Sequence, residues 1–245
     1  MWLHFNPGKD ALFLDVDGTL LDIAPTAQKV KVSRSLVRDL GRLNRKLGGA
    51  LAFVSGRMIH ELDSLFSPLR LCSAGAHGAE WRLSPKGPVQ TGALLPDVLR
   101  DNIALAFANM DGVIIEDKIY NVAVHYRQVP QKAGIVGRTL ARLIGPYNKT
   151  VKLVRGRKVF EVMPLIHDKG KALEKFLAIE PFKNRRPVFL GDDVADISAI
   201  GACLKKGGVA ARVGQGKSRQ GYAFASPKHV RMWISRLADG KGFLL

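Results

Sequence analysis

Two aspartates stand directly after an apolar segment near the start of the chain. Residues Ala11 to Leu14 are apolar, and Asp15-Val16-Asp17-Gly18-Thr19 follows without a break. An apolar run of this length is typical of a buried strand in a parallel sheet, and Asp-Gly is typical of the turn that ends it. Ligands of such sheets bind beyond the carboxyl ends of the strands, so both carboxylates are predicted to lie at a binding edge.

The spacing of Asp15 and Asp17 suits a metal ion. The two side chains share one face while the backbone stays extended, and a divalent cation relieves the repulsion between them. A solvated turn and a calcium-binding loop are the alternatives. A calcium loop needs further oxygen ligands at regular spacing and a glutamate at its twelfth position, and Thr19-Leu20-Leu21 supplies neither.

The composition is that of a globular protein. Its 245 residues allow one large domain or a core with a smaller insert, and 47% hydrophobic with 24% charged residues is an ordinary balance. No apolar stretch reaches the roughly 18 residues that cross a bilayer, and the first ten residues lack the pattern of a secretory signal. We therefore expect a cytoplasmic protein. Cys72 and Cys203 are too few and too far apart for a disulfide framework or a zinc site.

Basic residues exceed acidic ones by 38 to 21, a formal net charge of +17. Residues 1–130 hold 15 basic and 13 acidic residues, whereas residues 131–245 hold 23 and 8. Clustered cations are typical of nucleic-acid-binding surfaces, and a positive field also speeds the capture of anionic substrates. A solvated basic surface is the third interpretation. The chain has no zinc finger, no aromatic RNA-binding strand and no GxxG clamp, which disfavours nucleic acid.

A strand–helix–strand rhythm follows the aspartate pair. Residues 33–43 have apolar residues at helical spacing with Ser33 or Ser35 as the cap, residues 50–54 form an apolar strand, and residues 71–75 form another. The second strand ends at Ser55-Gly56-Arg57, where a hydroxyl and turn N–H groups can bind an anion, although such a sequence is also an ordinary turn. The rhythm predicts an α/β fold with a doubly wound, Rossmann-like parallel sheet.

From residue 96 to residue 164 the pattern changes to helix, hairpin, helix, hairpin. Helices are predicted over 97–110 and 131–144, and antiparallel pairs over 112–117 with 122–127 and over 151–154 with 159–163. This order is typical of a compact α+β module. We therefore predict a core made of residues 1–95 and 165–245, with an inserted α+β domain at residues 96–164.

A second acidic cluster appears when the core pattern resumes. Asp168-Lys169-Gly170-Lys171 opens a helix, and residues 187–190 form the last predicted strand, which runs into Gly191-Asp192-Asp193-Val194-Ala195-Asp196. Helix capping, worth about 1 kcal/mol, is the simpler explanation of such aspartates. Three acidic groups in six residues are more than capping needs. Mg²⁺ prefers oxygen ligands, so an acidic cluster at each of two strand ends is what a magnesium ion shared between them would require.

The four motifs in this order resemble the haloacid dehalogenase superfamily of aspartate-nucleophile phosphatases. The resemblance implies that Asp15 is a nucleophile that forms an aspartyl-phosphate, and that Asp17 acts as general acid and then as general base. Phosphoryl transfer relies mainly on positioning and charge neutralisation, which agrees with these motifs. The further contacts that the resemblance implies are Thr19, Ser55 and Lys169 for the phosphoryl group, and Asp15, the Asp17 carbonyl, Asp192, and Asp193 or Asp196 for Mg²⁺.

Four further segments resemble trehalose-6-phosphate phosphatases: residues 75–80, 113–118, 123–127 and 159–164. The likeness extends from about Lys9 to Leu237. It implies that the insert is a cap that closes over the substrate, excludes water and lets remote sugar contacts contribute to the rate. Taken singly, charged residues in hairpins are more often surface charges. The substrate contacts that the resemblance implies are Arg57, His77, Glu116, Lys118, His125, Arg127 and Glu161.

The last acidic motif departs from that family, which usually reads Gly-Asp-Asp-x-Thr-Asp-Glu. Ala195 and Ile197 replace the threonine and the glutamate, so we expect weaker Mg²⁺ binding or an altered substrate preference. The expected function is Mg²⁺-dependent hydrolysis of trehalose 6-phosphate by a monomer without membrane or nucleic-acid partners. The alternatives are a phosphatase for sucrose phosphate or mannosyl-phosphoglycerate, a catalytically weak sugar-phosphate-binding regulator, and a nucleic-acid-binding protein.

Overall fold

The chain forms two compact units in the computed structural model, which describes residues 5–23, 30–156, 158–214 and 222–241. The core unit comprises Met1–Gln90 and Asp168–Leu245, and the insert unit comprises Thr91–His167. The insert unit begins at residue 91, where the sequence suggested 96, and ends at residue 167, where it suggested 164. None of the described helices is both long and apolar enough to cross a membrane.

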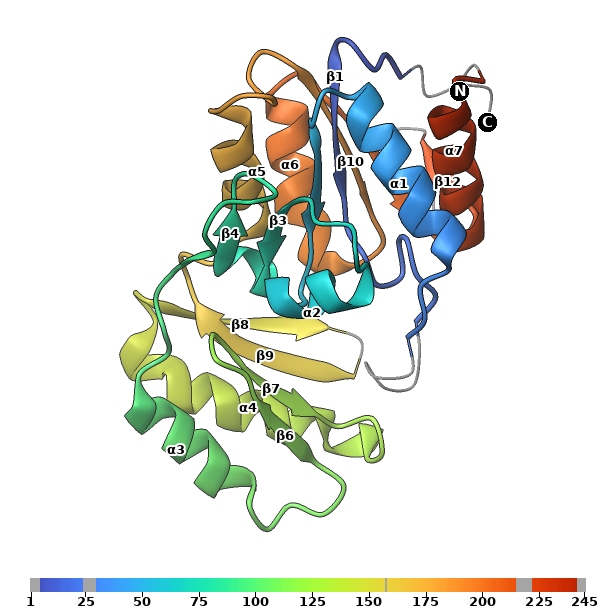
Figure 1. Cartoon of the computed structure of the whole chain (residues 1–245). Coiled ribbons are helices and arrows are strands. Elements are labelled where there is room, and N and C mark those ends of the chain that lie inside the picture. Colours follow the sequence, from blue (N-terminus) through green and yellow to red (C-terminus); the bar gives the residue numbers. More distant parts are fainter. Residues whose placement is uncertain (1–4, 24–29, 157, 215–221, 242–245) are drawn as a thin grey trace. The chain divides into compact units, whose positions relative to one another are not determined.

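Within the described residues, a sheet of eight strands, mostly parallel, forms the centre of the core unit (Figure 1). Its order is β12-β11-β10-β1-β2-β3-β4-β5, so β1 lies between β10 and β2 and pairs with both in parallel. β1 and β2 are buried along their whole length, which explains their unbroken apolar runs. The strands are β1 (Asp10–Leu14), β2 (Leu51–Val54), β3 (Cys72–Gly75), β4 (Glu80–Arg82), β5 (Gln90–Thr91), β10 (Arg186–Gly191), β11 (Val209–Val213) and β12 (Ala223–Phe224).

The prediction that residues 187–190 form the last strand of the core is wrong. β11 and β12 follow β10 and extend the parallel sheet on that side. β11 reads Val-Ala-Ala-Arg-Val, and its small residues and its arginine hide the apolar run that marks β1 and β2. The expected α/β class with a parallel, Rossmann-like core is confirmed.

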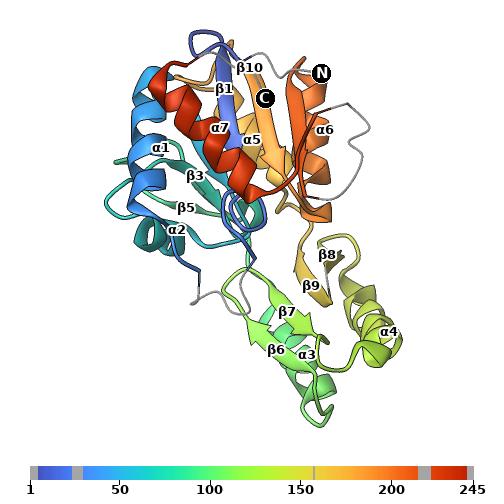
Figure 2. The same cartoon turned by 90° about the vertical axis from the view of Figure 1, so that its right-hand side faces the viewer.

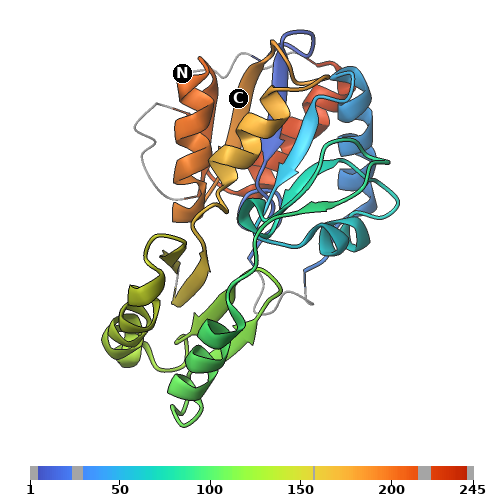
Figure 3. The same ribbon diagram turned by 90° about the vertical axis from the view of Figure 1, so that its left-hand side faces the viewer.

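Helices cover both faces of the core sheet. α1 (Arg34–Lys46) and α7 (Pro227–Asp239) pack together on one face, and α5 (Lys169–Leu177) and α6 (Ile197–Lys205) pack together on the other (Figures 2 and 3). The short α2 (Ile59–Leu65) precedes β3. Ser33, one of the two serines expected to cap this helix, accepts a hydrogen bond from the Leu36 N–H at 3.2 Å through its side chain. The helix α1 then begins at Arg34.

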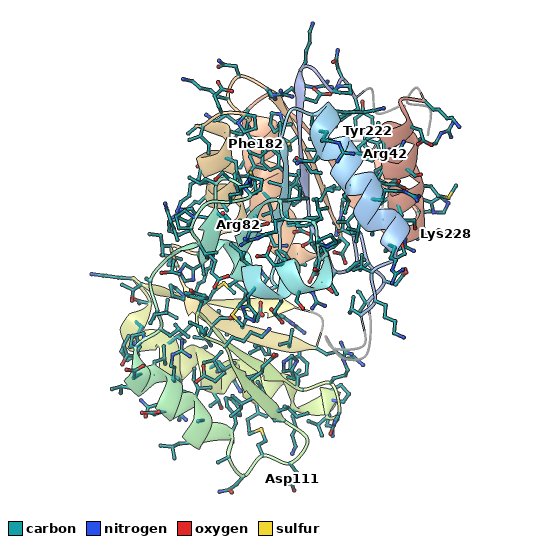
Figure 4. The ribbon with its side chains drawn as sticks, viewed as in Figure 1. Arg42, Arg82, Asp111, Phe182, Tyr222 and Lys228 are labelled. Atoms are coloured by element: carbon teal, nitrogen blue, oxygen red, sulfur yellow. The ribbon has the colours of Figure 1, made fainter. Side chains whose placement is uncertain are left out.

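Aromatic packing fixes β1 against α5. The Phe13 ring lies 5.4 Å from the ring of Phe182, which Figure 4 labels, and 6.0 Å from the ring of Phe176 on α5. All three rings are fully buried. Contacts of this kind hold the carboxyl end of β1, and therefore the aspartates that follow it, in one position.

In its described part, the insert unit has a four-stranded antiparallel sheet and two α-helices. The helices are α3 (Asp97–Phe107) and α4 (Ala133–Ile144), and the strands are β6 (Ile114–Asp117), β7 (Val122–His125), β8 (Val151–Gly156) and β9 (Val159–Pro164). The order β6-β7-β9-β8 shows that the two predicted hairpins join through β7 and β9 into one sheet. Val124 and Val162 pack into the unit's core with Leu99 of α3 and Leu140 of α4. Because side chains alternate along a strand, Glu161 and His125 are turned to the opposite face.

Candidate active site

The two acidic motifs meet at the carboxyl edge of the core sheet. One carboxylate oxygen from each of Asp15, Asp192 and Asp196 lies within 4.8 Å of the others. Asp15 follows β1 and Asp192 follows β10, and the Asp15 N–H continues the pairing of these strands by donating to the Leu190 carbonyl at 2.9 Å. The predicted meeting of the clusters is therefore a direct result of β1 and β10 being neighbours.

A glycine makes this approach possible. Gly18 has a φ of +82°, and a Cβ at this position would lie 2.1 Å from Oδ2 of Asp192. Only a residue without a side chain allows both the left-handed backbone and the close carboxylate. The Thr19 hydroxyl, in the same turn, donates to Oδ1 of Asp192 at 3.4 Å. The turn after β1 is thus shaped around the aspartate that follows β10.

Lys169 lies inside the acidic cluster. Its Nζ donates to Oδ1 of Asp15 at 2.8 Å and to Oδ1 of Asp196 at 2.6 Å, and all three side chains are almost fully buried. Lys169 is the first residue of α5, because Asp168 caps that helix by accepting from the N–H groups of Gly170 and Lys171. The helix start therefore places the ammonium between two carboxylates.

The charges of the cluster do not balance. Among the described residues, three carboxylates face one ammonium group, so the ionised cluster carries a net charge of −2 in a largely buried site. Burial raises the pKa of Asp15 well above its ordinary value, with Lys169 opposing and Asp196 adding to the rise. Burial also raises the pKa of Asp192 to about 6, with Asp196 and Asp193 adding to it. For Lys169, burial lowers the pKa, but the Asp15 and Asp196 carboxylates outweigh that effect and raise it above the ordinary value.

This donor set fits a divalent cation. Hard cations such as Mg²⁺ take carboxylate and carbonyl oxygens, and a charge of +2 would neutralise the excess of the cluster. The carboxylate of Asp193 lies outside the group of three. It accepts a hydrogen bond from the Val194 N–H at 2.7 Å, which is the helix-capping role that the sequence allowed as an alternative to metal binding. The carboxylate of Asp17 also lies outside it, which leaves its main-chain carbonyl as the predicted contact.

Arg57 binds the carboxylate of Asp17. Both predicted residues lie just beyond strand ends, Asp17 after β1 and Arg57 after β2. The guanidinium makes two hydrogen bonds to Asp17, at 2.6 and 2.7 Å, and its own pKa is raised, first of all by this hydrogen bonding. Ser55 is buried, and its Oγ accepts from the Arg57 N–H at 3.1 Å. A Cβ on Gly56 would lie 2.8 Å from the ring of His77, so the absence of a side chain there admits the histidine.

A second group of predicted residues lies in the insert unit. Oε2 of Glu116 is 3.1 Å from Nε2 of His125 and 3.4 Å from Nζ of Lys118. The hydrogen bond from His125 lowers the pKa of Glu116, burial opposes this, and Lys118 adds to the lowering. Oε1 of Glu161 accepts from Nδ2 of Asn121 at 3.2 Å. The strand register puts Glu116 and Glu161 in one cross-strand row, so polar side chains line one face of this sheet.

The sequence-predicted site residues therefore form two groups, each within its own unit. Arg127 is the least constrained of them, because it follows β7 as an exposed side chain. Three residues with a place beside these groups were missed: Asn121, Arg100 and Arg212. Arg100 of α3 holds the turn between β6 and β7, and Nη2 of Arg212 donates to the Asp192 carbonyl at 3.0 Å. An arginine inside the apolar strand β11 was the available signal for Arg212, but that strand itself was not predicted.

A parallel sheet with a buried Asp–Lys–Asp cluster at its carboxyl edge and an α+β insert defines a phosphatase of the haloacid dehalogenase fold. Solved structures share this fold. The C-terminal domain of trehalose-6-phosphate phosphatase from C. albicans has a TM-score of 0.82 at 17% identity, covering 98% of this chain and 99% of that one. A trehalose-6-phosphate phosphatase related protein has a TM-score of 0.76 at 20% identity, covering 94% and 97%.

The chain belongs to the trehalose-phosphatase family, whose model matches residues 13–227. A probable trehalose-phosphate phosphatase of Sinorhizobium fredii is 40% identical over 206 residues, 83% of this chain and 77% of the relative. Trehalose-6-phosphate phosphatase of Escherichia coli is 35% identical over 234 residues, 94% of this chain and 86% of the relative. The family predicted from the motifs is confirmed, and the chain is a phosphoric monoester hydrolase.

Proposed function

We propose that this enzyme hydrolyses trehalose 6-phosphate to trehalose and inorganic phosphate. The observation that carries the proposal is sequence identity of 35–40% to relatives named for this activity, over most of the chain. The family model spans the whole insert unit as well as the acidic motifs. The match therefore includes the residues that we assign to the sugar and those that we assign to the phosphoryl group.

The proposed reaction has two steps, both centred on Asp15. A carboxylate oxygen of Asp15 attacks phosphorus, an aspartyl-phosphate forms, and the bond from phosphorus to the sugar oxygen breaks while Asp17 gives that oxygen a proton. Asp17 then takes a proton from a water molecule, whose oxygen attacks phosphorus and displaces Asp15. Trehalose and phosphate are released, and both aspartates return to their starting states.

We propose that the metal is Mg²⁺. Its ligands are Asp15, Asp192 and the Asp17 carbonyl, and Asp196 or Asp193 supports the site. A bound Mg²⁺ would neutralise charge on the phosphoryl oxygens. Ser55, Thr19 and Lys169 are the proposed phosphoryl contacts. The position of Lys169 between two carboxylates supports this role, because the ammonium is held in place before substrate arrives.

The insert unit is the proposed cap. The polar face of its sheet is the proposed sugar site. Carboxylates such as Glu116 and Glu161 accept hydrogen bonds from sugar hydroxyls, and cationic side chains donate to them. The pairing of Glu116 with His125 and Lys118 orients these groups in advance, which reduces the entropy lost on binding. The proposed substrate contacts are Arg57, His77, Glu116, Lys118, His125, Arg127 and Glu161.

The test is phosphate release from trehalose 6-phosphate beside sucrose phosphate, mannosyl-phosphoglycerate and hexose phosphates. We expect the highest kcat/KM on trehalose 6-phosphate, loss of activity with chelator and recovery with Mg²⁺, and no activity in Asp15→Asn. A higher kcat/KM on another sugar phosphate would keep the mechanism and reject the substrate. Absence of turnover on every substrate would favour a sugar-phosphate-binding regulator.

The partners and the location stay predictions. We propose a monomer in the cytoplasm without a nucleic-acid partner, and the +17 net charge makes the last point worth testing. Light scattering after gel filtration would measure the oligomeric state. A gel shift at two salt concentrations would detect nucleic-acid binding, because phosphate contacts weaken steeply as salt rises.

A further inference from the structure

Both polar atoms of the Asp192 main chain are held by side chains. Its N–H donates to Oδ2 of Asp196 at 2.9 Å, and its carbonyl accepts from Nη2 of Arg212 at 3.0 Å. The next N–H, of Asp193, also donates to Oδ2 of Asp196 at 3.1 Å. The loop that carries the proposed metal ligand is therefore fixed from two directions by residues of different elements.

The loop needs such support because its geometry is tight. A Cβ on Gly191 would lie 2.4 Å from Oδ2 of Asp196, and one on Gly18 would lie 2.1 Å from Oδ2 of Asp192. The Asp192 carboxylate can therefore reach Asp15 only from a narrow range of main-chain positions. The loop's neighbours Ala195 and Ile197 have no polar side-chain atoms to help, and Ile197 is 59% exposed.

Arg212 is well placed to hold the carbonyl. It lies on β11, directly opposite Gly191 in the register between β10 and β11, so the strand pairing brings it beside the loop. Its side chain is exposed, and within the described residues no carboxylate forms an ion pair with it. It therefore brings a positive charge next to a site that we assign to a divalent cation.

The charge of Arg212 and its hydrogen bond should have opposite effects on metal affinity. An arginine near a metal ion repels it, so charge alone would weaken metal binding. A hydrogen bond that orients a ligand strengthens metal binding, and loss of such an outer contact typically costs about 10–100-fold in affinity. The sign of the effect of removing Arg212 therefore tells the two apart.

We propose that Arg212 is a positioning residue that holds the Asp192 carbonyl and so orients the Asp192 carboxylate toward the metal. The proposal rests on the proposed function only in assigning a divalent cation to this cluster. Arg212 acts through Asp192 in this account and touches neither the substrate nor the metal. Its contribution is greater here because Ala195 and Ile197 leave the loop without polar neighbours of its own.

The experiment is a calorimetric titration of the substrate-free full-length protein with Mg²⁺. Arg212→Gln removes the charge and the guanidinium donor, and Arg212→Lys keeps a charged donor. Lys206→Gln, an exposed residue at the end of α6, is the control for the same loss of charge. We expect Arg212→Gln to weaken Mg²⁺ binding about 10-fold, Arg212→Lys to recover most of it, and Lys206→Gln to leave it unchanged.

Three outcomes would overturn the proposal. Tighter Mg²⁺ binding in Arg212→Gln would show that the arginine acts only as a charge, and unchanged binding would show that its hydrogen bond does not orient the ligand. Equal weakening in Lys206→Gln would show that the effect does not depend on the contact between Arg212 and Asp192. A higher KM for trehalose 6-phosphate with an unchanged Mg²⁺ affinity would make Arg212 a substrate contact instead.

Two further readouts separate the possible failures. Thermal melting of the metal-free variants should match that of the parent, because Arg212 is exposed. If Arg212→Gln is destabilised, its Mg²⁺ affinity is compared with that of Arg212→Lys. Equal Mg²⁺ affinities in these two variants would reject the proposal. Mg²⁺ binding is measured without substrate. A parent that binds Mg²⁺ but does not release phosphate from trehalose 6-phosphate would reject the proposed function and leave this inference intact.

Discussion

Arg57 donates two parallel hydrogen bonds to Asp17, from Nε to Oδ2 at 2.6 Å and from Nη2 to Oδ1 at 2.7 Å. A planar guanidinium that makes two such bonds fixes the plane of the carboxylate as well as its position. The Asp17 side chain is 38% exposed, so this pair rather than burial holds it in place. The residue that we assign to proton transfer is therefore oriented by a residue that resemblance assigns to the substrate.

Arg57→Lys should lower kcat more than it raises KM. Lysine keeps the charge but cannot make both hydrogen bonds, so Asp17 would lose its fixed orientation, and misplaced acid–base groups typically cost about 100-fold in rate. Steady-state phosphate release from trehalose 6-phosphate measures this. Arg70→Lys, at a more exposed ion pair with Asp63, is the matched control. A variant with unchanged kcat would remove Arg57 from the orientation of Asp17.

Lys169→Met should destabilise the fold as well as abolish activity. Methionine has a similar length but leaves the buried carboxylates of Asp15 and Asp196 without their shared ammonium, and breaking such a pair costs about 3–5 kcal/mol. Denaturant unfolding in chelator measures the loss. Lys171→Met, on the exposed side of α5, should change stability by less than about 0.5 kcal/mol. Equal stability of the two variants would contradict the central position of Lys169.

Stabilisation by Mg²⁺ should be larger at pH 7.5 than at pH 5. The pKa of Asp192 in the folded protein is raised to about 6, chiefly by burial, so protons compete with the metal below that pH. Without metal, the folded state binds more protons than the unfolded state between about pH 4 and pH 6, and stability falls as pH rises through that window. Bound Mg²⁺ compensates for this loss only where the carboxylates are ionised.

Thermal melting with and without Mg²⁺ at the two pH values checks this prediction. Asp192→Asn is the control, because its side chain neither titrates in this range nor carries the charge that attracts the ion. We expect the shift in Tm to be small in that variant at both pH values. A shift in the parent that is as large at pH 5 as at pH 7.5 would contradict a pKa near 6 for this carboxylate.

Arg100→Ala should raise KM for the disaccharide phosphate while sparing the chemistry. Arg100 donates to the carboxylate of Asp117 and to the carbonyls of Lys118 and Ile119, at 2.9 Å for Lys118, and so fixes the turn that carries a proposed sugar contact. We expect KM to rise about 10-fold, since an ordered turn would become mobile. Hydrolysis of p-nitrophenyl phosphate, which has no sugar, should be unchanged.

Arg138→Ala, an exposed arginine on α4, is the control for Arg100. It removes the same charge from the insert unit without a contact to the turn between β6 and β7. An equal rise of KM in both variants would indicate that the charge of the unit, and not the position of the turn, governs binding. Loss of p-nitrophenyl phosphate hydrolysis in Arg100→Ala would give this arginine a wider role than the turn.

The double variant Ala195→Thr with Ile197→Glu should bind Mg²⁺ several-fold more tightly. It restores the usual motif of the family, and the 59% exposure of Ile197 leaves room for a charged side chain. Polar neighbours that orient a ligand loop raise metal affinity, and an added carboxylate also attracts the cation. The same titration used for Arg212 measures it. Unchanged affinity would show that Asp196 and Arg212 already hold the loop fully.

Much of the fold follows from local patterns that the chain carries in its sequence. The apolar runs of β1, β2 and β10 mark buried parallel strands, and the serines at 33 and 35 indicate the start of α1, which the structure shows is capped by Ser33. Such patterns depend only on residues close together in the sequence, so these elements can be predicted without knowledge of the rest of the chain. The strand β11 was not predicted because its arginine interrupts a short apolar run, and the hydrogen bonds that make it a strand come from β10.

The sequence by itself determined which chemistry is present, because the order of the acidic motifs, the strand-end serine and the lysine at a helix start is characteristic of one family. Only the tertiary structure decided how these groups meet. Lys169 lies 154 residues from Asp15 and 27 from Asp196, yet contacts both. The Arg212 contact with Asp192 depends on β11 pairing beside β10. The physical reason is that periodicity sets which face a side chain takes, whereas its partner across the sheet is set by long-range strand pairing and by the packing that selects it.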